Sequence, residues 1–268
     1  MSQTHENAAV EADTGPVIAK GIDDEPLAGN QRNYGSVMGW GIAVLCVLYT
    51  AFHIVILNFY PLETWTYRMI HVTGGLFLGF LIYSAKSVSA EADGSASRNP
   101  IEWLLMAVAG AGIGYGSALI AYAWAGWWLA GTAIPAPFLF GTYGIPLLAG
   151  TLAAIAAAWF FSGRHPERLY WADGLLGVAA IAVLGYILFN VGALRLRAGT
   201  GMAQPGDFYA ALVGVLLILE VTRRVAGLAL VAISVIFILY SFTGPYLPGF
   251  LSHRGYTPTR FFTYVFTD

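Results

Sequence analysis

The stretch LEVTRRVAG, residues 219–227, places one glutamate and two adjacent arginines inside a long apolar run. That run extends from Phe208 to Phe242 and holds no other Asp, Glu, Lys or Arg. An isolated charge in hydrocarbon is costly. The three charges therefore either mark a turn at a membrane surface or form a working site within the bilayer, and the course of the whole chain has to decide between the two.

The composition indicates a polytopic membrane protein. Of the 268 residues, 57% are hydrophobic and only 10% are charged, whereas a soluble domain carries about 25% charged residues. The net charge of −2 offers no basic surface for nucleic acid. A single cysteine, Cys46, excludes an internal disulfide and a thiolate-rich metal site. We expect no cofactor and no metal ion.

Seven apolar runs predict seven transmembrane helices, because a span needs about 20 mostly apolar residues. These runs cover residues 34–59, 69–85, 101–131, 138–161, 169–190, 208–222 and 225–240. No alternation of the outer-membrane-barrel kind appears. The expected fold class is therefore all-α, a polytopic membrane helical bundle.

The chain divides into five predicted segments. Residues 1–34 are polar and acid-rich and are expected to form a disordered cytoplasmic tail. Residues 35–99 form the first membrane hairpin, and residues 100–163 form a second, two-helix hairpin. Residues 164–243 hold helices five to seven. Residues 244–268 contain three prolines and cannot be one continuous helix.

The placement of lysine and arginine sets the predicted orientation. Short turns with Arg164 and Arg168, and with Arg223 and Arg224, favour the cytoplasmic side. The N-terminus is then cytoplasmic and the C-terminus periplasmic. The two arginines of the opening stretch fall at the inner membrane face, where they need not be buried. Glu220 precedes them by three and four residues, a spacing that suits pairing along one helix.

Two pairs of polar residues have alternative interpretations. His53 and His71 lie near the outer ends of the first two spans, where paired histidines can relay protons. A hydrogen-bonded packing role is favoured, because no carboxylate cluster accompanies them. Glu102 and Asp173 each lie in the first turn of a predicted span, where negative charge suits the helix N-terminus.

A glycine series predicts close helix packing in the third span. Gly110, Gly112, Gly114 and Gly116 form two overlapping G-x-x-x-G patterns, which allow backbones to approach closely in membranes. We expect Gly110 and Gly114 at an interface with the fourth span.

The C-terminal part resembles a segment of the TRAP transporter permeases, specifically the TAXI-type proteins in which small and large membrane parts are fused. The resembling elements are Leu219–Gly227, Tyr240, GPYLPG at residues 244–249 and HRGY at residues 253–256. Upstream, FYPLETWTYRMIH at residues 59–71 is similar to the first hairpin of the family, with Arg68 and His71 at matching positions.

The resemblance covers residues 36–86 and 169–264, so residues 100–163 represent an insertion. Without it, five spans remain: four for the small part and one connecting helix, over residues 225–240. That connector would bring the chain to the outer face, where the large transport domain of the family begins. The orientation from basic residues independently places the C-terminus on the same side.

The resemblance implies a function in secondary transport. TRAP systems take up an organic acid from a periplasmic binding protein and use an ion gradient; the large part carries the substrate and ion sites, and the small part is a scaffold. We therefore expect a small membrane subunit or domain in the bacterial inner membrane. Its partners would be a large TRAP membrane subunit, a periplasmic substrate-binding protein and the lipid bilayer. The residues expected to have structural or interface roles are Glu220, Arg223, Arg224, His71, Arg68, Gly110 and Gly114.

The alternative is a self-contained seven-helix membrane protein, such as a sensor or a small channel. It would act without a partner and would need a polar pathway, yet the third and fourth spans hold little beyond Ser, Thr and Tyr as polar residues. No nucleophile elbow, Ser/His/Asp constellation or metal-ligand spacing appears. We expect no catalytic residues and no enzyme activity.

Overall fold

A computed structural model describes most of the chain: residues 29–86, 99–132, 138, 141–162, 168–197 and 202–267. Within these ranges the protein is helical and has no strand, apart from one isolated backbone bridge between Gln31 and Tyr83. The predicted all-α fold class is confirmed. Arg164, which entered the predicted orientation, lies outside the described residues.

The described helices follow the predicted apolar runs, with one extra short helix at the end. They are α1 (Ser36–Asn58), α2 (Thr64–Ile82), α3 (Pro100–Ala130), α5 (Gly144–Phe161), α6 (Trp171–Arg197), α7 (Pro205–Ala226), α8 (Leu228–Thr243) and α9 (Pro258–Thr267). Two 3-10 turns, η2 (Gly244–Tyr246) and η3 (Gly249–Leu251), lie between α8 and α9.

Five of these helices are long and apolar enough to cross a membrane: α1, α3, α5, α6 and α8. The protein is thus a multi-pass membrane protein. The other two predicted spans form α2 and α7, which carry several charged or titratable residues, among them Arg68, His71 and Glu220. Seven membrane crossings stay a prediction, as does the orientation of the two termini.

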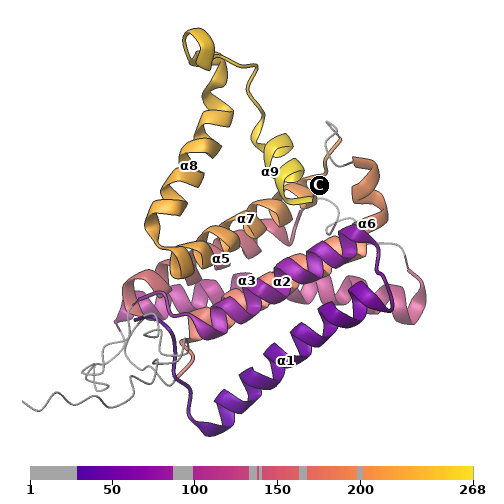
Figure 1. The fold of residues 1–268 in the computed structure, drawn as a ribbon. Coiled ribbons are helices and arrows are strands. Elements are labelled where there is room, and N and C mark those ends of the chain that lie inside the picture. The colour runs from indigo at the N-terminus through magenta and orange to yellow at the C-terminus, as the bar shows by residue number, and fades with distance from the viewer. Residues whose placement is uncertain are drawn as a thin grey trace, which may run out of the picture.

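Helix α6 is the centre of the bundle, because it packs against α2, α3, α5 and α7. Figure 1 shows these helices lying alongside one another, with α1 and α8 leaving the bundle in different directions. The core consists of side chains from all five bundle helices. It includes Phe80, Ile113, Leu147, Leu176 and Leu217, each of which is 0% exposed.

The predicted close packing of the glycine-rich helix α3 against α5 is present, but on the other face of the series. A Cβ atom at Gly112 would collide with the Pro146 carbonyl oxygen, and one at Gly150 would come within 2.7 Å of the Ile113 backbone nitrogen. At Gly110 and Gly114 nothing lies within 4 Å of the same atom. The expectation that these two residues form the interface is therefore wrong.

The helices α1 and α8 stand apart from the core. None of the α8 residues is buried, and the spanning part of α1 is 0% buried. Gly227, with φ of +84°, separates α7 from α8; only glycine adopts this backbone conformation readily. After the two 3-10 turns the chain returns, and α9 packs on α7 with Phe266 against Gly214 (Figure 1).

The predicted disordered tail is wrong over its last six residues, 29–34. The Arg32 backbone N–H donates to the Ile82 carbonyl at 2.9 Å, and the Tyr34 hydroxyl donates to the Leu81 carbonyl at 2.5 Å. These contacts hold the segment against the end of α2. The tail over residues 1–28 lies outside the described residues.

Candidate functional site

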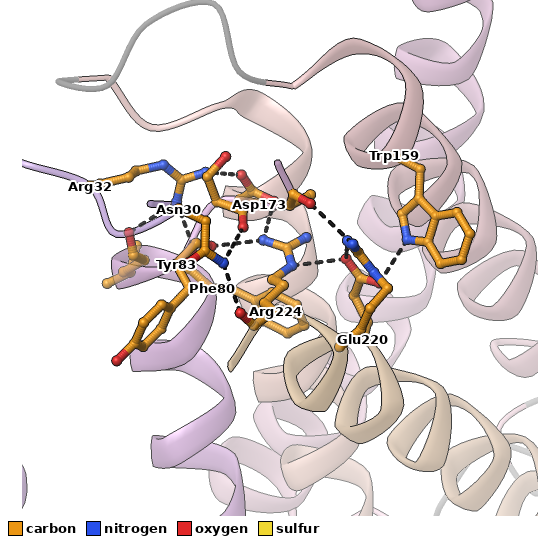
Figure 2. A network of polar contacts seen from close by, with 12 residues as sticks. Asn30, Arg32, Phe80, Tyr83, Trp159, Asp173, Glu220 and Arg224 are labelled. Carbon is orange, nitrogen blue, oxygen red and sulfur yellow. Dashed lines mark hydrogen bonds and ion pairs between the residues drawn. The ribbon is translucent and has the colours of Figure 1, made fainter. Parts of the chain in front are cut away.

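The opening stretch forms a local ion-pair group at the end of α7 (Figure 2). Arg223 binds Glu220 with both ends of its guanidinium group, Nε to Oε2 at 2.9 Å and Nη2 to Oε1 at 2.8 Å. Arg224 donates from Nε to the same Oε1 at 2.8 Å. The predicted pairing along the helix is confirmed for both arginines.

Arg224 is nevertheless buried, with a side chain 0% exposed. Its Nη1 donates to Asp173 Oδ1 at 2.7 Å and to the Tyr83 carbonyl at 3.0 Å, and its guanidinium lies 4.9 Å from the centre of the Phe80 ring. The expectation that these arginines need not be buried is wrong for Arg224, since α7 turns this side chain toward α2 and α6. Arg223 keeps 17% of its side chain exposed.

Asp173 links three separate parts of the chain. It lies in the first turn of α6, as predicted, and its side chain is 0% exposed. One carboxylate oxygen pairs with Arg224 of α7, and the other pairs with Arg32 of the N-terminal segment. A favourable negative charge at the helix N-terminus was the expected role. The structure adds an interhelical role, because two guanidinium groups converge on this carboxylate (Figure 2).

Arg32 and Arg223 also donate hydrogen bonds to carbonyl groups at the end of α2 and just after it. Its last carbonyl groups lack partners within the helix, and guanidinium supplies five donors. Arg32 Nη1 donates to the Phe80 and Leu81 carbonyls in the last turn of α2 at 2.9 and 3.0 Å. Arg223 Nη1 donates to the Ala85 carbonyl, three residues after the end of this helix, at 3.0 Å. We define the Asp173 cluster as Arg32, Asp173, Glu220, Arg223 and Arg224. It ties α2, α6 and α7 together.

Two further side chains complete the surroundings of this cluster. The Trp159 indole of α5 donates to Glu220 Oε2 at 2.8 Å, and its ring stacks under the Arg223 guanidinium at 4.7 Å. Asn30 Nδ2 donates to the Arg224 carbonyl at 2.7 Å. Through Trp159, α5 is joined to the end of α7.

A second buried polar group lies at the opposite end of α6 and α7. Asp207, in the first turn of α7, accepts from Arg197 Nε and Nη2 at 3.0 and 2.9 Å and from the Tyr186 hydroxyl at 2.8 Å. The Tyr143 hydroxyl donates to the Gly206 carbonyl at 2.6 Å. We define the Asp207 cluster as Tyr143, Tyr186, Arg197 and Asp207. It joins α5, α6 and α7.

The two clusters follow one electrostatic rule. Both α6 and α7 begin with an aspartate and end with arginine, the arrangement that the helix dipole favours. Because the two helices run antiparallel, Asp173 of one meets Arg224 of the other, and Arg197 meets Asp207. The 17 residues from Asp207 to Arg224 correspond to about 26 Å of helix. This length is close to the roughly 30 Å thickness of a bilayer core.

The other predicted residues lie between α1 and α2. His71 Nδ1 lies 2.6 Å from His53 Nε2, so the two histidines form a hydrogen bond, as the packing interpretation requires. Arg68 lines a cavity of about 320 Å³ with Pro61 and Tyr67. Across the described ranges, no three His, Cys, Asp or Glu side chains gather closely enough to hold a metal ion.

Sequence reasoning missed Arg32 and all members of the Asp207 cluster. For Asp207 a signal was present, because Gln204 and Asp207 form a capping box at the start of α7. For Arg32 there was none, since the residue lies in a polar, acid-rich segment. The residue also pairs with a partner 141 positions away.

Comparison with known proteins adds no assignment: no family model, no curated protein and no solved structure matches the chain. The helices and the two clusters define it as a helical, multi-pass membrane protein in which buried aspartate, glutamate and arginine side chains form ion pairs between helices.

Proposed function

We propose that this chain is the small membrane subunit or domain of a TAXI-type TRAP transporter and acts as a scaffold. The complete system would take up an organic acid from a periplasmic binding protein with an ion gradient, in the bacterial inner membrane. One observation carries the proposal: the charged side chains of Glu220, Arg223 and Arg224 bind one another and other groups of the same helical bundle. Charges that are paired within the bundle in this way support a bracing role rather than substrate binding.

The second resembling region supports the same proposal, because its motifs contact one another. The Tyr240 and His253 rings lie 4.7 Å apart, and His253 Nε2 lies 3.1 Å from the Tyr240 carbonyl oxygen. A side chain at Gly244 would collide with the His253 ring. The Tyr256 backbone N–H donates to the Ser241 carbonyl at 3.0 Å. The spaced residues of the resemblance thus build one compact cap at the end of α8.

The course of α8 fits a connecting helix. It leaves the bundle after Gly227 and has no buried residue, and apolar side chains such as Ile236 and Phe237 remain 62% and 65% exposed. We propose that the large membrane part packs beside this helix and that lipid covers the remaining surface. The substrate and ion sites would belong to that large part, and this chain would perform no catalytic step.

The test is a double variant, Arg223→Ala with Arg224→Ala, in the complete transporter. We expect a lower yield of assembled complex, with the substrate affinity of the complex that does assemble nearly unchanged, because the cluster stabilises the scaffold. Arg195→Ala is the matched control: its ion pair with Glu63 is about half exposed and should leave the yield intact. Normal assembly with abolished uptake would contradict the scaffold role and indicate a direct part in transport.

A further inference from the structure

Two histidines join α1 to α2 at a distance from both charge clusters. His53 Nε2 lies 2.6 Å from His71 Nδ1, with the ring planes at 79°. Tyr49 adds a second link, since its hydroxyl donates to the His71 carbonyl at 2.7 Å. Little else holds α1, which contacts α2 and has a spanning part that is 0% buried.

The surrounding groups fix where the hydrogens lie. His53 Nδ1 is 2.6 Å from the Tyr49 carbonyl oxygen, and a carbonyl oxygen can only accept. His53 Nδ1 therefore carries a hydrogen, and in the neutral ring Nε2 is an acceptor. The hydrogen between the two rings must then come from His71 Nδ1. The Tyr49 hydroxyl lies 3.1 Å from the same Nδ1. Because its own hydrogen points to the His71 carbonyl, this hydroxyl presents a lone pair to Nδ1.

This arrangement leaves one place for an added proton. His71 Nε2 belongs to an exposed side chain, and within the described part of the chain no hydrogen bond to it is present. A proton there keeps the hydrogen between the rings and makes that bond charge-assisted, which strengthens it about twofold. A second proton would place hydrogens on both facing nitrogens, which cannot remain 2.6 Å apart. The path also ends at the Tyr49 carbonyl, so it cannot relay protons onward.

We propose that His53 and His71 together bind only one added proton, on His71 Nε2, while the hydrogen already shared between the two rings in an N–H–N bridge keeps α1 fastened to α2. The neighbouring titratable groups are Tyr49 of α1 and Tyr67 of α2, whose ring centre lies 5.6 Å from that of His53. Arg68 lies one turn before His71 on α2. Aromatic rings around the pair favour a single positive charge. The inference does not depend on the proposed transport function.

The test counts protons on the full chain in lipid nanodiscs. Proton uptake is measured from about pH 8 to about pH 5.5, a range that includes the ordinary imidazole value of about 6.5. It is measured for the unaltered protein and for the double variant His53→Gln with His71→Gln. The shared bridge predicts a difference of about one proton per chain, whereas two independent imidazoles would give about two. A difference of two overturns the proposal.

A second measurement uses the unaltered protein, so its result does not depend on whether the double variant folds normally. With ¹⁵N-labelled histidine, the hydrogen between the rings should give a scalar coupling between His53 Nε2 and His71 Nδ1 that persists across the whole range. His253→Gln is the control, since this histidine bonds the Tyr240 carbonyl and its loss should leave the coupling in place. Absence of the coupling in the unaltered protein, or its loss as the first proton binds, also overturns the proposal.

Discussion

At the scale of single residues, Asp173 has the most demanding role in the bundle. Its carboxylate is the meeting point of Arg32 and Arg224, and the side chains of all three are at most 2% exposed. Breaking a buried ion pair by removing one partner costs far more than the pair contributes relative to an apolar core. The stability of this end of the bundle should therefore depend strongly on one negative charge.

The substitution Asp173→Asn tests this dependence. It preserves the side-chain shape but leaves two buried guanidinium groups short of one negative charge, and we expect a loss of about 3–5 kcal/mol in unfolding free energy. The measurement is SDS-induced unfolding of the purified protein in detergent. Glu63→Gln removes a carboxylate whose side chain is 41% exposed and should have a far smaller effect. Equal effects of the two variants would contradict the structural role of Asp173.

We expect the N-terminal cap of α2, which Glu63 forms, to depend on pH. The backbone N–H of Thr66, with smaller contributions from Trp65, the Thr66 hydroxyl and Arg195, lowers the pKa of the Glu63 carboxyl from 4.5 to about 2. Because the folded-state pKa is depressed, the cap contributes fully above pH 4.5 and is lost as the pH falls through about 2. The ¹³C shift of the Glu63 carboxyl in an NMR titration measures this directly; a midpoint at the ordinary value would show that the cap is not formed.

At the scale of elements, the α3–α5 pair is held by backbone proximity at Gly112 and Gly150. Overpacking a close helix contact costs about 1–3 kcal/mol, whereas alanine in place of glycine in an open helix position stabilises by up to about 1 kcal/mol. We therefore expect Gly112→Ala to lower the stability and Gly110→Ala to leave it unchanged or raise it. Thermal denaturation of the two variants, identical in chemistry and two residues apart, measures the difference. The opposite order would place the α5 interface on the predicted face of α3.

The antiparallel pair of α6 and α7 shows how local rules act at a distance. Each helix obeys the dipole preference by itself, with acid first and arginine last. The interhelical pairs then follow from antiparallel packing without any further pattern in the sequence. Asp173 and Arg224 are 51 positions apart, so neither residue alone indicates its partner.

For the whole molecule, the length of the apolar runs was enough to predict the described helices from α1 to α8, because about 20 apolar residues in a row have few other solutions in a membrane. The short helix α9 was not predicted. The Glu220 pairs were predictable because both partners lie on one helix turn. Arg32 was not, since composition alone placed it in a tail. The glycine series did not indicate which face of α3 packs against α5. Glycine at every second position offers two equivalent faces, and only the position of the neighbouring helix selects one.

The whole-molecule proposal is that the chain braces a larger transporter. Two paired clusters hold α6 and α7 at both ends, about 26 Å apart along α7. The described side chains buried between them are mostly apolar, with Thr151 of α5 as a polar exception. Two helices, α1 and α8, remain outside this core. Such a molecule offers a firm centre and wide apolar flanks, as a membrane scaffold requires.

The most direct test is the intact mass of the gene product, purified mildly from its native membrane with everything that accompanies it. We expect either a single chain far longer than 268 residues or a large hydrophobic subunit that co-purifies with this one. A lone, stable and unpartnered chain near 28.7 kDa would contradict the scaffold proposal and favour a self-contained membrane protein.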